Sequence, residues 1–185
     1  MKKIFLALLG MTFLSATSVS AQSPDVRGER PERKILIAYY SWSGNTKTVA
    51  ESIQKQIGGD LFEIQTVQTY PSDYDATVEQ AGKEIKEGYR PELKVLPEDV
   101  SKYDFVFIAS PNWWGTIAPA VSTFLEKVNL EGKKVVPIIT HGRGGLQRTV
   151  ADLTEQCKDC IMIQSWHGYG NQTEGLSAWL EGVGF

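Results

Sequence analysis

Residues 35–46 read ILIAYYSWSGNT, an apolar run that passes directly into hydroxyl, amide and glycine residues. The apolar half is typical of a strand buried on both faces of a sheet. Residues 48–57 follow with apolar side chains at helical spacing, so the polar half is expected to form a strand-to-helix turn. Free N–H groups and the helix dipole favour an anion at such a turn. Two interpretations remain open from these residues alone: an ordinary capped turn, or a cradle for a phosphate.

The rest of the chain alternates between predicted strands and predicted helices. Strands are expected at residues 34–40, 60–67, 105–110, 134–140 and 161–166. Helices are expected at residues 48–57, 74–88, 118–128, 146–157 and 173–180. This alternation predicts one parallel sheet with helices on both faces, and the length is that of one ordinary domain.

Three of the predicted loops that follow strands have an unusual composition. They read SWSGNT at residues 41–46, PNWWGT at 111–116 and HGRGG at 141–145. Ligands of parallel sheets bind at the carboxyl ends of the strands, where the strand order reverses. In a strand order of 2-1-3-4-5 the three loops would lie side by side, so a binding site is expected there.

These loops resemble those of the flavodoxin family, and the resemblance extends from about residue 34 to residue 180. Residues 41–46 match the family's phosphate-loop pattern, [ST]-x-[ST]-G-N-T, at each position. The resemblance implies an α/β, flavodoxin-like three-layer sandwich over residues 34–185, with five parallel strands in the order 2-1-3-4-5. Flavodoxins, which hold FMN between their first and third strands, are themselves a known example of the rule for binding at strand ends.

The resemblance also implies FMN as the cofactor. A phosphate dianion can be held by neutral N–H and O–H donors, and residues 41–46 contain no Lys or Arg. The expected cofactor-binding residues come from the three loops: Ser41, Trp42, Ser43, Gly44, Asn45, Thr46, Ser110, Pro111, Asn112, Trp113, Trp114, Gly115, Thr140, His141, Gly142 and Gly145. No catalytic residue and no metal ligand is predicted.

Several side chains in these loops have two interpretations. Trp113 and Trp114 either form a wall for the flavin ring or pack in the core. His141 either covers the second face of the ring or lies on a surface loop without a role. Arg143 either places a positive charge near the ring or is solvated. For Gly115, the resemblance implies a peptide that turns over when flavin N5 gains a proton, which glycine tolerates because it accepts positive φ.

Two further groups lie outside these loops. His167 follows the last predicted strand and is expected to be structural or exposed. Cys157 and Cys160 are separated by two residues at the end of a predicted helix. Catalytic thiol pairs of this spacing lie at helix N-termini, so a structural disulfide or two free thiols is expected instead.

The first 33 residues are not expected to belong to the domain. Residues 1–21 have a basic start, an apolar centre and small residues before Gln22, which is typical of a cleaved signal peptide. Residues 22–33 are polar and are expected to form a flexible lead-in. The protein is therefore expected to be exported to the periplasm, without a membrane span after cleavage. The net charge of −3 for the whole chain gives no indication of nucleic-acid binding.

The expected function is that of an FMN-binding, flavodoxin-like electron-transfer protein. Its partner would be another redox protein or a small-molecule electron acceptor. One alternative is an FMN-dependent NAD(P)H:quinone-type oxidoreductase, which would share this fold. A second is a flavin-free module that binds another phosphorylated ligand, because fold alone does not determine function.

Overall fold

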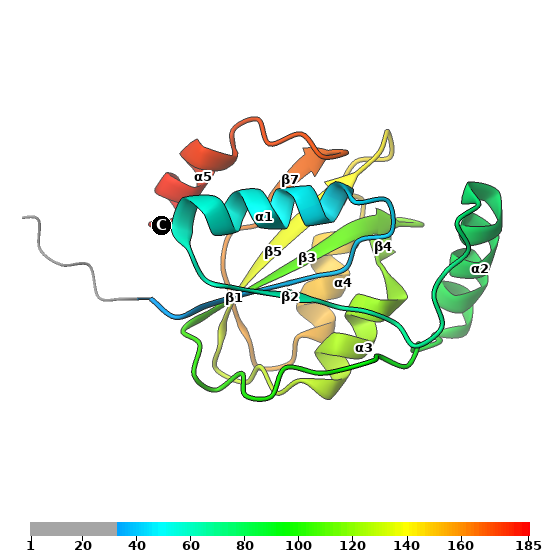
Figure 1. Cartoon of the computed structure of the whole chain (residues 1–185), viewed down its shortest axis with the longest axis horizontal. Coiled ribbons are helices and arrows are strands. Elements are labelled where there is room, and N and C mark those ends of the chain that lie inside the picture. Colours follow the sequence, from blue (N-terminus) through cyan, green and yellow to red (C-terminus); the bar gives the residue numbers. More distant parts are fainter. Residues whose placement is uncertain (1–32) are drawn as a thin grey trace, which may run out of the picture. The chain divides into compact units, whose positions relative to one another are not determined.

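The computed structural model describes residues 33–185 (Figure 1). The predicted signal peptide, residues 1–21, and residues 22–32 of the predicted lead-in lie outside the described residues. Within residues 33–185, no helix combines the length and apolar character that crossing a membrane requires.

The sheet contains the predicted parallel strands and two further short strands. Its order is β2-β1-β3-β5-β6. These strands are β2 (Asp60–Glu63), β1 (Ile35–Tyr39), β3 (Phe105–Trp113), β5 (Lys134–His141) and β6 (Ile161–Met162). A further parallel strand, β7 (Trp166–Tyr169), pairs with β5, and β4 (Thr116–Ile117) pairs with β3 in the antiparallel sense. The fold class and the inner strand order are as predicted.

The predicted strand at residues 161–166 is divided into β6 and β7. They pair with two stretches of β5 that lie on either side of residues 136–137. Pro137 has no N–H to donate to a ladder, so regular pairing along this part of β5 is weakened. The strand predicted at 60–67 also stops at Glu63, and Thr66 instead forms an isolated antiparallel bridge with Leu93.

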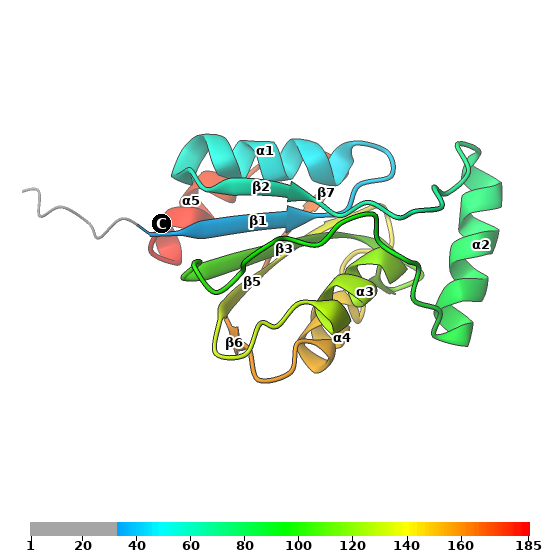
Figure 2. The same ribbon diagram turned by 60° about the horizontal axis from the view of Figure 1, so that its bottom comes forward.

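Four helices cover the two faces of the sheet, as Figures 1 and 2 show. One face carries α1 (Asn45–Ile57) and α5 (Leu176–Gly182), and the other carries α3 (Pro119–Lys127) and α4 (Thr149–Gln156). The fifth helix, α2 (Tyr74–Glu87), covers neither face and stands beyond the carboxyl ends of the strands. The predicted helices on both faces are thus present, and the place of α2 beside the sheet is one that the sequence did not indicate. Only Thr77 and Ala81 are buried along α2, so it has no broad apolar stripe to pack on a sheet.

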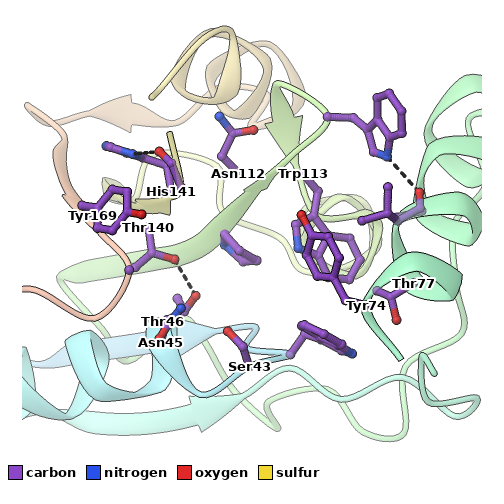
Figure 3. A pocket seen from close by; sticks show the side chains of 17 residues that line it. Ser43, Asn45, Thr46, Tyr74, Thr77, Asn112, Trp113, Thr140, His141 and Tyr169 are labelled. Atoms are coloured by element: carbon purple, nitrogen blue, oxygen red, sulfur yellow. Dashed lines mark hydrogen bonds between the residues drawn. The ribbon is translucent and has the colours of Figure 1, made fainter. Parts of the chain in front are cut away.

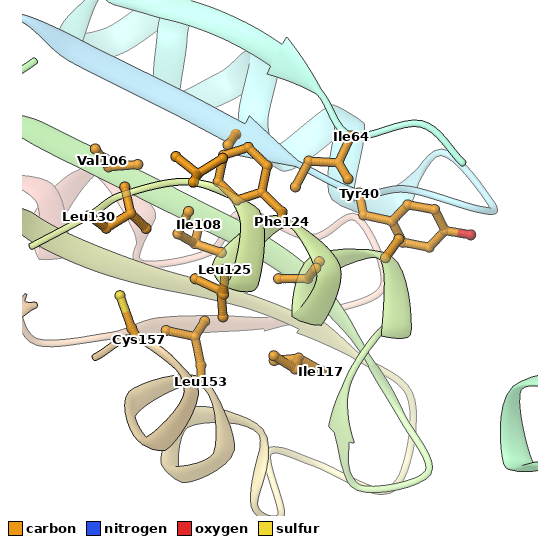
Figure 4. Close-up of a cluster of buried hydrophobic side chains, with 14 of the residues drawn as sticks. Tyr40, Ile64, Val106, Ile108, Ile117, Phe124, Leu125, Leu130, Leu153 and Cys157 are labelled. Carbon is orange, nitrogen blue, oxygen red and sulfur yellow. The ribbon is translucent and has the colours of Figure 1, made fainter. Parts of the chain in front are cut away.

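The core is divided by the sheet into two clusters because successive strand residues point to opposite faces. Val106 and Ile108 of β3 pack with Phe124, Leu125 and Leu153 of the helices on one side (Figure 4). On the other side, Ile37 and Phe107 pack with Val49, Ile53 and Leu176. Both clusters fix the strand ends, and with them the loops that the sequence singled out.

Residues 111–116, predicted to form a loop, form a hairpin instead. β3 continues to Trp113 and pairs with Thr116 of β4, which leaves a turn of Trp114 and Gly115. Both turn residues have positive φ, at 52° and 86°. Positive φ at both positions is typical of the two-residue turn whose twist matches that of the strands. Glycine adopts positive φ readily and other residues do not, so the turn suits Gly115 better than Trp114.

Candidate cofactor-binding cleft

A cleft of about 480 Å³ lies at the carboxyl ends of the strands, between the start of α1 and the exposed helix α2 (Figure 3). The three loops that the sequence singled out all contribute to it. Its lining is Trp42, Ser43, Asn45, Thr46, Tyr74, Thr77, Val78, Ala81, Pro111, Asn112, Trp113, Trp114, Thr140, His141, Gly142, Tyr169 and Gly170. None of these side chains is that of Lys, Arg, Asp or Glu, so the cleft offers neutral donors and aromatic surface.

The start of α1 forms one end of the cleft. The helix begins at Asn45, three residues earlier than predicted, after Gly44 with a φ of 87°. The N–H of Thr48 is the first to reach a helical acceptor, the Gly44 carbonyl at 3.0 Å. The N–H groups of residues 45–47 precede this bond and have no acceptor within the helix. They meet the hydroxyls of this turn at the positive end of the helix dipole.

One hydroxyl of this turn is unsatisfied. Ser41 Oγ is buried and forms no hydrogen bond with residues 33–185. A buried hydroxyl without a partner is unfavourable by about 1–3 kcal/mol, so an acceptor supplied by a ligand would stabilise it. The Thr46 hydroxyl, in contrast, is bonded to Thr140 Oγ1 at 2.8 Å and is almost fully buried. Thr46 therefore joins α1 to the end of β5. Its hydroxyl is engaged in this bond, whereas Ser43 is exposed.

Trp113 forms part of an aromatic cluster at the other end of the cleft. Its ring packs edge-on against Tyr40 and Tyr70, with centroids 5.5 and 4.9 Å away. Tyr70 also donates a hydrogen bond to Glu84 of α2. Burial, and then this bond to Glu84, raise the pKa of the Tyr70 hydroxyl well above its usual value. Burial likewise raises the pKa of the Tyr40 hydroxyl. Both phenols therefore stay neutral beside the cleft at ordinary pH.

Trp114 is more exposed than Trp113. Its side chain is 65% exposed, and its Nε1 donates to the Val78 carbonyl of α2 at 2.9 Å. Both tryptophans line the cleft, so neither serves only to fill the core. Trp113 is fixed by aromatic packing, whereas Trp114 is fixed by a polar bond to the opposite wall.

Asn112 organises the hairpin and the loop after β5. Its Oδ1 accepts from the Gly115 N–H at 2.9 Å, and its Nδ2 donates to the Gly145 carbonyl. The Gly115 carbonyl accepts from the N–H of Arg148 at 2.9 Å. Both polar groups of Gly115 are thus engaged within the protein, and Gly115 lies outside the cleft lining. The turnover of a Gly115 peptide stays a prediction, and it would require one of these two bonds to break.

Two histidines meet at the edge of the cleft. His141 Nε2 lies 3.0 Å from His167 Nδ1, and His141 Nδ1 lies 2.8 Å from the Gly142 carbonyl. A carbonyl only accepts, so the contact with Gly142 requires a proton on His141 Nδ1, and with both rings neutral the donor to His141 Nε2 is His167 Nδ1. His167 is exposed, as predicted, but the sequence did not indicate its contact with His141. Arg143 is also exposed and lies outside the cleft lining.

Five of the predicted cofactor-binding residues do not line the cleft: Ser41, Gly44, Ser110, Gly115 and Gly145. Gly44 sets the start of α1. The Ser110 hydroxyl is buried, donates to the Pro111 carbonyl and accepts from the Ala118 N–H, so it serves the fold. The other eleven predicted residues line the cleft together.

Sequence reasoning missed one wall of the cleft and part of another. The missed residues are Tyr74, Thr77, Val78 and Ala81 of α2, together with Tyr169 and Gly170 after β7. Tyr74 belongs to a Tyr70-Pro71-x-x-Tyr74 pattern that also resembles flavodoxins. That pattern was a usable signal, whereas nothing in the sequence placed α2 at the strand ends.

The two cysteines do not line the cleft. Cys157 and Cys160 form a disulfide just after α4, at the carboxyl end of the helix. The pair thus has the structural disulfide that was one of the two expected states, and it lacks the helix N-terminus that activates a redox thiol.

Comparisons with known proteins agree with this geometry. The flavodoxin family model matches residues 34–183. A crystal structure from Bacteroides eggerthii, of a protein provisionally described as a flavoprotein, is 32% identical with a TM-score of 0.73. The similarity covers 82% of this chain and 98% of that one. A flavoprotein from Lactobacillus acidophilus, crystallised in complex with FMN, is 28% identical with a TM-score of 0.68. That similarity covers 80% of this chain and 98% of the other.

No match is found among proteins with curated descriptions. The family model nevertheless covers nearly all of the described residues, including the turn at the start of α1 and the hairpin. The chain therefore belongs to the flavodoxin family.

Proposed function

We propose that the cleft binds FMN and that the protein acts as a flavodoxin-like electron carrier. The observation that carries this proposal is the turn at residues 41–46. It presents free N–H groups, hydroxyls and a helix start to a cleft that has no charged side chain in its lining. Such a turn suits a phosphate dianion. The flavoprotein from Lactobacillus acidophilus with FMN, to which this chain is similar, supports the same cofactor.

The residues present fit FMN in kind as well as in place. The N–H groups of residues 45–47 and the exposed Ser43 hydroxyl would hold the phosphate at the start of α1. In Figure 3, His141 and Tyr169 lie across the cleft from Trp113 and Tyr74, so aromatic side chains stand on both sides of the space for a flat ring. Bound FMN supplies one- and two-electron redox chemistry, while the protein supplies binding and orientation.

FMN is expected rather than FAD or riboflavin. The turn serves one terminal phosphate, and the sequence has no G-x-G-x-x-G pattern for a second nucleotide. The test is titration of the apoprotein with FMN, FAD and riboflavin, followed by stepwise reduction under absorbance. FMN should bind most tightly and accept electrons. Failure to bind any flavin, with retained binding of another phosphorylated compound, would contradict the proposal and favour the flavin-free module.

The electron partner is part of the same proposal. A redox protein or a small-molecule acceptor would take electrons from the bound cofactor. Steady-state turnover of NAD(P)H with a quinone distinguishes the carrier from the oxidoreductase alternative. A carrier should turn over slowly without a partner reductase, and fast turnover by the purified protein would replace the carrier with the enzyme.

We also propose that the protein is exported to the periplasm and acquires FMN there. The support is the sequence of residues 1–21, which resembles a general secretory signal without a twin arginine. Such a signal directs an unfolded chain across the membrane, and the phosphate turn exists only in the folded domain. Cell fractionation with N-terminal sequencing tests this. FMN-loaded protein in the cytoplasm that retains Lys2 and Lys3 would contradict both the signal and the uptake route.

A further inference from the structure

Helix α2 forms a wall of the cleft without belonging to either layer of the sandwich. Tyr74, Thr77 and Val78 of this helix face the cleft, and the helix stands beyond the strand ends (Figures 1 and 3). Its buried residues are Thr77 and Ala81, whereas seven residues of α3 are buried. Little apolar burial therefore resists movement of α2 away from the sheet.

Hydrogen bonds hold α2 and the residues just before it at two places beside the cleft. At its start, the Trp42 indole and the Thr77 hydroxyl both donate to the Pro71 carbonyl at 2.8 Å. Across the mouth of the cleft, Trp114 Nε1 donates to the Val78 carbonyl at 2.9 Å. Within residues 33–185, no other hydrogen bond joins the β3–β4 hairpin to α2. One indole N–H therefore closes this side of the cleft.

The conformation of Trp114 is not explained by burial. Its side chain is 65% exposed, and its φ of 52° is uncommon for a residue other than glycine. The hairpin turn holds the residue in this conformation, and the turn directs the indole toward α2. An exposed, unusually oriented indole that reaches the helix across a cleft is placed to bridge the two walls.

Helix α2 has a matching recess at Gly82. A Cβ at this position would lie 2.9 Å from Cε2 and 3.0 Å from Nε1 of Trp114. A real Cβ does not approach so closely, so the indole can lie against the helix only because residue 82 is glycine. Gly82 has no positive φ that would otherwise require glycine. The recess and the indole thus form a fitted pair outside the phosphate turn.

We propose that α2 is a gate of the FMN cleft and that Trp114 is its latch, an inference that rests on the proposed function. When the indole N–H releases the Val78 carbonyl, α2 swings away from the hairpin and the cleft opens for FMN. The latch acts on the opening of the cleft, so its loss should change the rates of FMN association and dissociation together. A folded apoprotein can in this way take up its cofactor without unfolding.

The test is stopped-flow FMN binding to apoprotein with Trp114→Phe, which keeps a ring and removes the N–H. Loss of one net hydrogen bond should raise the FMN association rate about three- to tenfold, and the dissociation rate should rise with it. The matched control is Trp113→Phe. Trp113 packs on Tyr40 and Tyr70, and a Phe ring keeps part of this packing and leaves the Trp114 indole in place, so this variant should change dissociation without accelerating association.

A second pair of variants leaves both tryptophans in place. Gly82→Ala displaces the indole through the added Cβ, and it should accelerate exchange as Trp114→Phe does. Gly182→Ala is its control, because this helical glycine has no positive φ and an added Cβ there would meet no other atom within 4 Å. Both substitutions replace a helical glycine by a better helix former, so a rate change confined to Gly82→Ala comes from the latch.

Hydrogen exchange of the apoprotein tests the gate without FMN. Amides of α2 should exchange faster in Trp114→Phe and Gly82→Ala than in the parent, while those of α1 stay unchanged. If FMN fails to bind at all, the proposed function fails, and this measurement still decides the gate. Unchanged α2 exchange, or a rise in FMN dissociation alone, would overturn the latch and make Trp114 an ordinary contact of the flavin.

Discussion

α1 and α2 border the same cleft, but they are held by different forces. α1 buries Thr46, Val49, Ala50 and Ile53 against the sheet, whereas α2 buries only Thr77 and Ala81. α2 depends instead on hydrogen bonds from Tyr70 and Trp114, and the Trp42 indole bonds the Pro71 carbonyl just before the helix. The end of the cleft at α1 is therefore fixed by the core, whereas the end at α2 is held mainly by hydrogen bonds. A site assembled in this way can hold an anion firmly and still adjust around the rest of its ligand.

The largest expected effect contrasts the packing of the two helices. Ile53→Ala removes a fully buried side chain of α1 and should lower the free energy of unfolding by about 2–5 kcal/mol. Ile85→Ala acts on a half-buried residue of α2 and should lower it by under about 2 kcal/mol. Urea unfolding of both apoproteins measures the difference. Equal losses would mean that α2 is packed as firmly as α1.

The phosphate end is tested at Ser43, whose hydroxyl lines the cleft and is exposed. Ser43→Ala removes a donor to a charged group and should weaken FMN by about ten- to a hundredfold, while riboflavin is little affected. Thr48→Ala is the control, because Thr48 is exposed and its hydroxyl bonds the Gly44 carbonyl outside the cleft. Equal weakening of FMN and riboflavin would exclude a phosphate role for Ser43.

Thr46→Ala is a less specific probe of the same end. The Thr46 hydroxyl is bonded to Thr140, so its removal should reduce both FMN affinity and the stability of the apoprotein. Fluorimetric titration beside urea unfolding separates these two losses.

The aromatic end of the cleft is tested at Trp113. Trp113→Ala removes aromatic surface and should shift the flavin spectrum and weaken FMN by about 1–3 kcal/mol, or roughly ten- to a hundredfold. Trp114→Ala should have a smaller effect on affinity, because the Trp114 indole is bonded to α2. If both variants bind FMN as tightly as the parent, neither indole touches the ring.

The smallest effect concerns the attachment of α2 at alkaline pH. The folded-state pKa of Tyr70 is raised above its ordinary value of 10.0 by burial and by Glu84. Stability from a raised pKa is complete below pH 10 and is lost as the pH rises through the folded pKa. The parent should therefore lose stability above about pH 10, and Tyr70→Phe should lose less with each pH unit. Unfolding curves at pH 8 to 11 measure both slopes, and identical slopes would contradict the assignment.

The sequence by itself determined the sandwich and most of the phosphate end. Residues 35–46 carry a local signal: an apolar strand, a glycine-containing turn and an amphipathic helix are adjacent in the chain. Periodicity and composition also predicted five helices, and the structure places four of them on the faces of the sheet. The residue types of the three loops then indicated where a ligand would bind.

Only the tertiary structure decided the position of α2, the hairpin at Trp114 and Gly115, and the meeting of His141 with His167. The amphipathic spacing of α2 predicts a helix but does not say which surface it contacts. Thr46 and Thr140 are bonded although 94 residues separate them. Such contacts depend on how strand ends and loops converge in space, so no local pattern encodes them. For this reason the wall of the cleft at the start of α1 could be predicted from the sequence, whereas its opposite wall could not.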